Sequence, residues 1–245
     1  MGKAERTKQF IIEKTATLFN TKGIAATSLQ DMTEATGLTK GSIYGNFKNK
    51  DEVALEVFRY NFKKVTNLVA EEMARESTFR GKILCYPRIY TLFNDPRFPV
   101  GGCVILNTAI EVDDTLPFMC EEVSKAINSW KNTLIFLINE GIKAGEFRSE
   151  NKAEDLALQI IAIIEGAVML TKVSGKLDYM QSLMKTVENL INSLYSAGLA
   201  LALARQKPTE LSEFSKFDKL HDGLALPLSL QLCFGLGLKP KPSQN

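Results

Sequence analysis

The sequence has a single histidine, His221, and this scarcity limits the chemistry that the protein can perform. One histidine excludes zinc sites of the H-E-x-x-H type and leaves a serine–histidine–aspartate triad with one poor candidate. The chain also lacks a G-x-S-x-G turn, a phosphate-binding G-x-x-x-x-G-K-[ST] loop and any paired-carboxylate or metal-ligand spacing. We therefore expect a protein that is not an enzyme and that needs no cofactor and no metal.

Signals for export and for membrane insertion are also missing. The first residues, MGKAERTKQFIIEKTATLF, are too charged for a secretory signal, and we find no uninterrupted apolar run of about 18 residues that could span a bilayer. The four cysteines (Cys85, Cys103, Cys120 and Cys233) form no C-x-x-C pair. These features predict a cytoplasmic protein with reduced thiols and no membrane partner.

The charge is small overall but unevenly distributed. The net charge of the 245 residues is +2, which by itself names no partner. Residues 1–64 carry 11 Lys and Arg against 7 Asp and Glu, a net charge of +4, whereas the remainder has a net charge of −2. A basic first quarter on an acidic body fits an anionic partner at the N-terminal end.

Nearly every segment has the pattern of a helix, beginning with two helices near the N-terminus. Apolar residues from Ile12 to Phe19 recur at spacings of three and four, and this stripe ends at Gly23. A capping box, formed either by Thr27 with Gln30 or by Ser28 with Asp31, then starts a second helix. Gly37 ends that helix, because glycine readily adopts the left-handed conformation.

Two further helices are predicted next. Thr39 caps a third helix of about two turns that ends near Phe47, and Asn49 caps a long fourth helix that reaches about Arg75. Three short helices with a glycine in the turn between the second and the third are typical of a helix-turn-helix unit. The alternative is a generic helical bundle, but Ile43 and Phe47 are the only clear core residues of the third helix, which is a narrow apolar face for a packing helix.

The third helix has a composition that suits contact with DNA. Gly41 and Gly45 allow close approach of the backbone, and short hydroxyl and amide side chains hydrogen-bond phosphates or base edges. The run GIAATSLQDMTEATGLTKGSIYGNFKNKDEV resembles the DNA-binding domain of the TetR/AcrR family of bacterial transcriptional repressors, and the resemblance extends from about Arg6 to Val57. It implies an all-α homodimer with a DNA-binding domain at residues 1–50 and a larger helical domain at residues 51–195 that binds a small ligand and dimerises, with residues 51–75 as the linking helix.

The resemblance also carries over to individual positions of the head. The residues that it implies for binding double-stranded operator DNA are Ser28, Gln30, Thr39, Lys40, Ser42, Tyr44, Asn46 and Lys50. Two of them have another interpretation: Tyr44 could pack in the core, and Ser42 could be a solvated helix position. The chain departs from the family at Gly45-Asn46, where an aromatic or histidine pair is usual, and this departure leaves the operator sequence open.

Residues of the second domain suggest a ligand pocket. Cys103, Asn107 and Glu111 are spaced four apart, so we expect them on one helix face, with the Cys103 thiol at a helix N-terminus where its pKa is lowered. The G-G-C-x-x-x-N-x-A-x-E pattern resembles a TetR subgroup in which some members sense electrophiles or oxidants through a cysteine. The alternative is that cysteine fills space near a tight turn and that Asn107 caps or bridges helices.

Aromatic residues are the other candidates for the pocket wall. These residues are Phe62, Tyr90, Phe93, Phe118, Trp130 and Phe136. Aromatic side chains of a helical domain are also common in an ordinary core, and the sequence does not decide between these roles. In the same region, residues 79–95 are predicted to form a helix with Pro87 as a candidate break.

The two helices predicted near residue 195 are apolar on nearly all sides. Residues 153–173 and 178–195 therefore require cover, and a second subunit provides it most simply. Residues 196–245 extend beyond the usual end of the family and have no assigned role.

These features favour a ligand-responsive repressor that a small-molecule inducer releases from its operator. One alternative is a repressor that senses electrophiles or redox state through cysteine. Another is a helical adaptor that no longer binds DNA, which only the Gly45-Asn46 departure favours.

Overall fold

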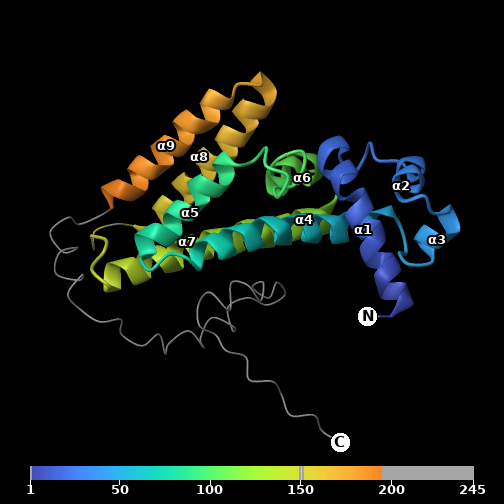
Figure 1. Ribbon diagram of the computed structural model, residues 1–245, viewed down its shortest axis with the longest axis horizontal. Coiled ribbons are helices and arrows are strands. Elements are labelled where there is room, and N and C mark those ends of the chain that lie inside the picture. The colour runs from blue at the N-terminus through green and yellow to red at the C-terminus, as the bar shows by residue number, and fades with distance from the viewer. Residues whose placement is uncertain (1, 149, 151, 195–245) are drawn as a thin grey trace, which may run out of the picture.

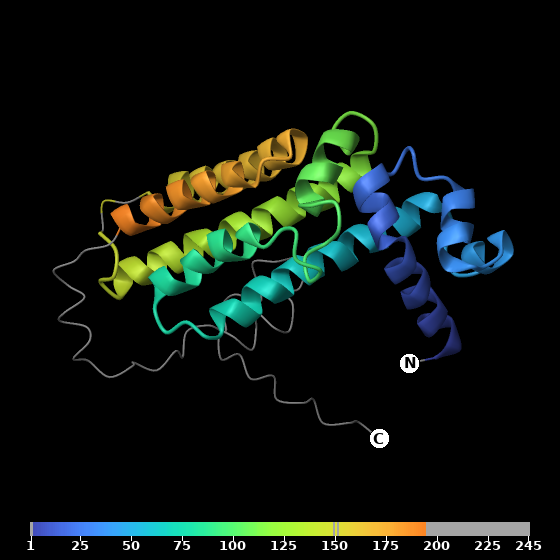
Figure 2. The same ribbon diagram turned by 45° about the horizontal axis from the view of Figure 1, so that its top comes forward.

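The computed structural model describes residues 2–148, 150 and 152–194, and it is all-α, as predicted (Figure 1). In chain order the helices of these residues are α1 (Lys3–Lys22), α2 (Leu29–Thr36), α3 (Lys40–Tyr44), α4 (Lys50–Met73), α5 (Phe79–Thr91), α6 (Val104–Val112), α7 (Pro117–Lys143), α8 (Ala153–Ser174) and α9 (Leu177–Ser193). The predicted extension, residues 196–245, lies outside the described residues. Helices α1–α3 form a small head at one end, and α4 runs from this head along the larger body (Figures 1 and 2).

Helix caps define the elements of the head. Of the two predicted capping boxes, the one that forms is Ser28–Asp31: Ser28 Oγ accepts the Asp31 N–H at 3.1 Å, and Asp31 Oδ2 accepts the Ser28 N–H at 2.7 Å. Gly37 then ends α2 in the left-handed conformation, with φ of +68°. Thr39 Oγ1 accepts the Ser42 N–H at 3.2 Å and begins α3. These interactions fix the start and end of α2 and the start of α3.

Helix α3 ends earlier than predicted, at Tyr44 and not near Phe47. Gly45 follows it, and the Asn46 N–H bonds to the carbonyl of Ile43 three residues back, which tightens the last turn. Ile43 and Phe47 are both buried, as expected for the two residues that anchor this segment in the head.

The body is built around α4 and α7, with α5 packed on both. Asn49 Oδ1 accepts the Glu52 N–H at 2.9 Å and starts α4, which ends at Met73, two residues before the predicted end. Pro87, the candidate break, lies inside α5 and does not end it. Helix α6 is short and lies between the head and the body, where it contacts α1, α4 and α7 (Figure 1).

Helices α8 and α9 form an antiparallel pair on the side of the body away from α4 (Figures 1 and 2). Within the described residues, α8 is the one helix that is long and apolar enough, by length and composition alone, to cross a membrane, although Glu165 and Lys172 interrupt its apolar run. Its inner face packs against α7 and α9. The outer face of the pair exposes Leu158, Met169, Leu170, Val173, Leu177 and Tyr179.

Candidate functional site

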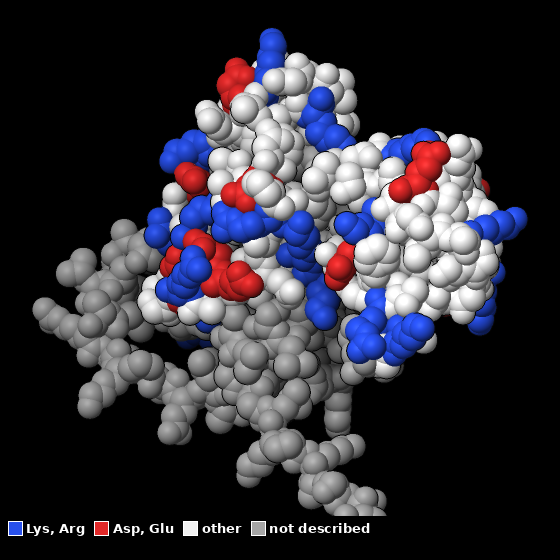
Figure 3. Space-filling view, turned by 45° about the vertical axis from the view of Figure 1, so that its right-hand side comes forward, with Lys and Arg blue, Asp and Glu red and all other residues white. Residues whose placement is uncertain are grey.

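Helix α3 presents an exposed polar face. Lys40 and Tyr44 are exposed, whereas Ser42 and Asn46 are half-buried. Tyr44 keeps 37% of its surface exposed, so it is not a core residue and the core-packing alternative is wrong. On the lobe to the right in Figure 3, which is the head, lysine and arginine side chains are more frequent than acidic ones.

Several of the predicted DNA-binding residues also stabilise the head. Ser28 and Thr39 are helix caps, and the Asn46 amide donates to the Ser42 carbonyl at 2.8 Å. Gln30, exposed on α2, donates to Glu34 at 2.8 Å. Hydrogen bonds from Lys22 and Ser28 hold the pKa of the Asp31 carboxyl well below its usual range, so the N-terminus of α2 keeps its negative cap.

Lys50 lies at the start of α4, but its ammonium group points back into the head. Its Nζ donates to the backbone carbonyls of Ile24 at 2.8 Å, Ala25 at 3.3 Å and Thr27 at 3.1 Å. An ammonium has three protons, so these contacts use its full donor capacity. Lys50 therefore fixes the turn between α1 and α2 and places a positive charge at the N-terminus of α4.

The other side of the same turn is held by α6. Glu111 Oε2 accepts the Ile24 N–H at 2.8 Å, and Oε1 accepts the Ala25 N–H at 2.6 Å. Gly23 adopts a φ of +87°, and a β-carbon there would lie 2.9 Å from Glu111 Oε2. The turn is thus bound by Lys50 from the start of α4 and by Glu111 from α6.

Asn107 makes a second contact between α6 and the head. Its Nδ2 donates to the Asn20 backbone carbonyl at 3.0 Å, and Asn20 Nδ2 donates to the carbonyls of Val100 and Gly102 at 2.8 and 3.1 Å. Asn107 Oδ1 accepts from Lys172 Nζ at 3.0 Å. The predicted face of Asn107 and Glu111 therefore lies against α1 and does not line a pocket with Cys103. The physical reason is that α1 covers this face of α6.

Cys103 stands apart from these two residues, in the interior of the body. Its thiol is 1% exposed and donates to Glu165 Oε1 at 2.9 Å, with Tyr90 Oη 3.8 Å away. Burial, together with the nearby Glu165 carboxylate, raises the pKa of Cys103 well above its ordinary value. The prediction of a lowered pKa is therefore wrong, because desolvation outweighs the favourable position at the start of α6.

Two of the six predicted aromatic residues stack on each other. Tyr90 and Trp130 are stacked with centroids 5.5 Å apart, and Tyr86 and Phe98 pack on this pair. Phe93 is buried, Phe62 stacks on Phe58 within α4, and Phe118 is exposed. The sequence reasoning missed Tyr86, Phe98 and Glu165; the lone carboxylate in the apolar run IIAIIEGAV was the available signal for the last.

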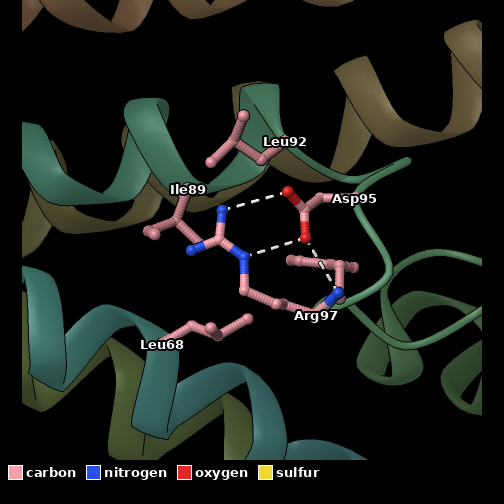
Figure 4. Close-up of a pocket in the computed structure, with 6 residues that line it drawn as sticks. Leu68, Ile89, Leu92, Asp95 and Arg97 are labelled. Carbon is pink, nitrogen blue, oxygen red and sulfur yellow. Dashed lines mark hydrogen bonds and ion pairs between the residues drawn. The ribbon is translucent and has the colours of Figure 1, made fainter.

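A small apolar pocket opens beside the aromatic cluster, between α4, α5 and the loop that follows α5 (Figure 4). It is lined by Leu68, Ile89, Leu92, Asp95, Arg97 and Phe98, and its volume of about 10 Å³ holds about one water molecule. The Arg97 guanidinium binds Asp95 at 2.9 and 3.0 Å and lowers the pKa of Asp95 to about 2. In this structure the interior is packed by its aromatic side chains.

A larger, open groove of about 460 Å³ lies between α1 and α4. Arg59 lines it and binds Glu122 of α7 through two nitrogens, at 2.7 and 3.1 Å. Glu122 is buried, and the hydrogen bonds that its carboxylate accepts raise the pKa of the Arg59 guanidinium. This pair ties the linking helix to the body near the head.

Both parts of the chain match known protein families. Residues 11–57 match the family described as "Bacterial regulatory proteins, tetR family", and residues 86–187 match "Tetracyclin repressor-like, C-terminal domain". Among curated proteins, the HTH-type transcriptional repressor DhaR of Mycobacterium sp. (strain GP1) is 22% identical over 76% of this chain and 96% of its own length.

Solved structures extend the similarity to the fold. A TetR-family transcriptional regulator from Cytophaga hutchinsonii is 42% identical, with a TM-score of 0.76 over 80% of this chain and 98% of its own. A TetR transcriptional regulator from Chloroflexus aurantiacus is 37% identical, with a TM-score of 0.75 and the same coverage. Members of this family bind operator DNA and act as dimers. The helix-turn-helix head, the helical body and these matches together place the chain in the TetR family of bacterial transcriptional regulators, which are not enzymes.

Proposed function

We propose that the protein is a homodimeric repressor of the bacterial cytoplasm that a small-molecule inducer releases from operator DNA. The observation that carries this proposal is the exposed face of α3. Lys40 and Tyr44 point outward from a helix that Ile43 and Phe47 anchor in the head. A short, rigidly mounted helix with small polar residues and one aromatic ring fits the major groove.

The proposed contacts fall into two kinds. Tyr44, Ser42 and Asn46 lie on or beside α3, where they can reach base edges or phosphates. Lys40, Thr39, Ser28 and Gln30 border this face and suit phosphate contacts, which position the head without reading sequence. Lys50 contributes through its charge and by holding the α1–α2 turn, since its three protons already bind backbone carbonyls.

The apolar outer face of α8 and α9 supports the dimer. Leu158, Met169, Leu170 and Val173 remain exposed on a helix whose other face is already packed. A twofold arrangement buries this face against its own copy and places two heads on half-sites about 34–36 Å apart. Two short recognition helices then share one binding event, which supplies affinity that one head lacks.

The contacts of α6 support a response to ligand. Asn107 and Glu111 hold α1 and the α1–α2 turn, so a shift of α6 displaces the head. An inducer must bind the released conformer more tightly than the operator-bound conformer, because only differential affinity shifts the population. We infer that α6, together with the Arg59–Glu122 pair that joins α4 to α7, sets this balance.

The direct test is fluorescence anisotropy with DNA from upstream of the protein's own gene. We expect wild-type protein to bind this DNA selectively and Tyr44→Ala to lose at least tenfold in affinity. Lys143→Ala, an exposed change at the end of α7 away from the head (Figure 2), serves as the control and should bind like wild type. Equal, weak binding of any duplex by all three proteins would instead support the adaptor without DNA binding.

Cysteine-based sensing of electrophiles stays a separate prediction. The burial of Cys103 and its raised pKa both oppose a reactive thiolate, so the geometry favours a reversibly bound inducer.

A further inference from the structure

Glu165 is a carboxylate with an unfilled hydrogen-bonding position in the interior of the body. Its Oε1 accepts the Cys103 thiol at 2.9 Å, whereas its buried Oε2 has no hydrogen-bond partner among the described residues. Burial raises the pKa of Glu165 to about 7. A buried acceptor without a partner is unfavourable and is normally explained by a function or by a missing ligand.

An aromatic cluster is joined to this carboxylate through the Cys103 thiol. Tyr90 reaches Cys103 through its hydroxyl and stacks on Trp130 with an interplanar angle of 4°, while Tyr86 covers the same indole at 5.7 Å. The indole Nε1 of Trp130 is also buried without a partner among the described residues. Aromatic faces and a carboxylate both carry negative electrostatic potential, so together they favour a cation with an apolar body.

The neighbouring cation does not fill this role. Lys172 lies on the same helix, and its aliphatic chain passes Gly102, but its ammonium donates to Asn107 Oδ1 at 3.0 Å. Burial lowers the pKa of Lys172, which further weakens it as a counter-charge for Glu165. Within the described residues, the carboxylate therefore remains open to an external donor.

We propose that Glu165 is the recognition residue of the inducer site and that the inducer is an aromatic amine whose protonated nitrogen donates to Glu165 Oε2. Its rings pack against Trp130 and Tyr90, which move apart to admit it. This inference rests on the proposed function and deepens it by naming the class of inducer.

The same carboxylate is linked to the head by contacts already described. Glu165 Oε1 holds Cys103, the residue that begins α6, and α6 carries Asn107 and Glu111 to the head. An ammonium that binds Oε2 pulls the Glu165 carboxylate away from Cys103. The hydrogen bond from the Cys103 thiol is then weakened, and the start of α6 is released. Binding of the amine at Glu165 thereby shifts α6 and, with it, the α1–α2 turn.

Trp130 is the only tryptophan in the chain, so its fluorescence reports this site alone. The probes are 2-phenylethylamine and 3,3-diphenylpropylamine, each compared with the alcohol and the carboxylate of the same skeleton. With full-length wild-type protein at pH 7.5, we expect the amines to change the Trp130 fluorescence saturably. The concentrations needed should be at least tenfold lower than for the matching alcohols or carboxylates. Equal effects of the three series, or no saturable effect of the amines, would overturn the proposal.

Two variants locate the effect. Glu165→Gln keeps the shape of the side chain and should weaken amine binding at least tenfold, whereas Glu154→Gln, an exposed position on the same helix, should leave it unchanged. Unchanged binding by a folded Glu165→Gln protein would contradict the assignment. If that variant does not fold, the comparison of amine, alcohol and carboxylate on wild type still decides.

The DNA assay separates this inference from the repressor function. Amine binding at Glu165 that lowers operator affinity supports both. Operator binding without any amine response retains the repressor and overturns the amine class. Amine binding without a change in operator affinity retains the site and overturns its coupling to the head.

Discussion

Gly23 on the head and Glu111 on α6 are in such close contact that the structure leaves no room for a side chain at residue 23. A β-carbon there would stand 2.9 Å from Glu111 Oε2, and the backbone φ of +87° favours glycine in any case. The same carboxylate accepts the N–H groups of the next two residues, Ile24 and Ala25. The head and the body therefore meet through a charged acceptor and a turn that is shaped to receive it.

Gly23→Ala tests this contact. We expect it to lower the free energy of unfolding by about 2–3 kcal/mol, combining backbone strain with displacement of the Glu111 carboxylate. Urea denaturation provides the measurement. Gly37→Ala is the control, since Gly37 has a φ of +68° but no atom within 4 Å of the new carbon, so it should lose only about 1 kcal/mol. Equal losses in both variants would remove the special role of the Glu111 contact.

The Arg59–Glu122 pair provides a second test, on the linking helix. Glu122→Gln removes the negative charge that holds the half-exposed Arg59 through two hydrogen bonds. After allowance for solvent screening at Arg59, we expect a loss of about 1–2 kcal/mol in thermal or urea unfolding.

Glu121→Gln is the matched control for this pair. Its exposed partner is Lys125, one turn along α7, and solvent screens such surface pairs, so the loss of stability should be smaller than that of Glu122→Gln. A loss from Glu122→Gln no greater than that from Glu121→Gln would mean that the pair does not fix α4 to α7.

Alkylation by N-ethylmaleimide tests the character of the Cys103 thiol. We expect it to react at least tenfold more slowly than the half-buried Cys120, because burial and the raised pKa suppress its thiolate. Peptide mass spectrometry of the native protein in a Cys233→Ser background distinguishes the sites. Rapid labelling of Cys103 accompanied by a loss of operator affinity would revive the sensor hypothesis.

The capping residues of the head were predictable because their interactions are local. The Ser28 side chain bonds three residues ahead, as do those of Thr39 and Asn49, so sequence spacing alone indicates the helix starts. Spacing also indicates which residues of α6 share a face. It does not indicate what covers that face, and Asn107 meets Asn20 across 87 residues of sequence.

The interior site was less predictable for the same reason. Glu165 is unusual in an apolar helix, but its partner Cys103 is 62 residues away, and the helix pairing that joins them follows from tertiary packing. Cys103 was expected to be reactive because the sequence indicates the start of a helix and not the depth of burial. Lys50 likewise binds the α1–α2 turn, a contact that no local pattern encodes.

Lys40 provides a test of phosphate contact in the proposed operator complex. In each head, Lys40→Ala removes one exposed positive charge from the start of α3. If each Lys40 contacts one phosphate, the slope of log K against log salt should fall by about 0.9 per head. Fluorescence anisotropy between 50 and 300 mM salt gives this slope, and Lys125→Ala on α7 is the control that should keep the wild-type value. An unchanged slope in Lys40→Ala would place the lysine away from the backbone.

The ionisation of Glu165 predicts an unusual dependence of stability on pH. Because burial raises its pKa from 4.5 to about 7, the folded state binds more protons than the unfolded state between these values. Stability from this group is therefore present below about pH 4.5 and is lost as the pH rises to about 7, by an amount on the order of 3 kcal/mol.

Comparison with Glu165→Gln isolates this contribution from the other carboxyl groups, including Asp95, whose lowered pKa acts in the opposite direction. The facing Cys103 thiol and Tyr90 hydroxyl stay protonated because burial raises both pKa values, and Lys172 is common to both proteins. Urea unfolding at pH 5, 6, 7 and 8 should show wild type falling relative to the variant up to about pH 7 and then running parallel to it. Parallel curves throughout would mean that Glu165 is ionised at pH 5. The carboxylate would then carry a full charge in the interior, and the unfilled position at Oε2 would have a protein or solvent donor.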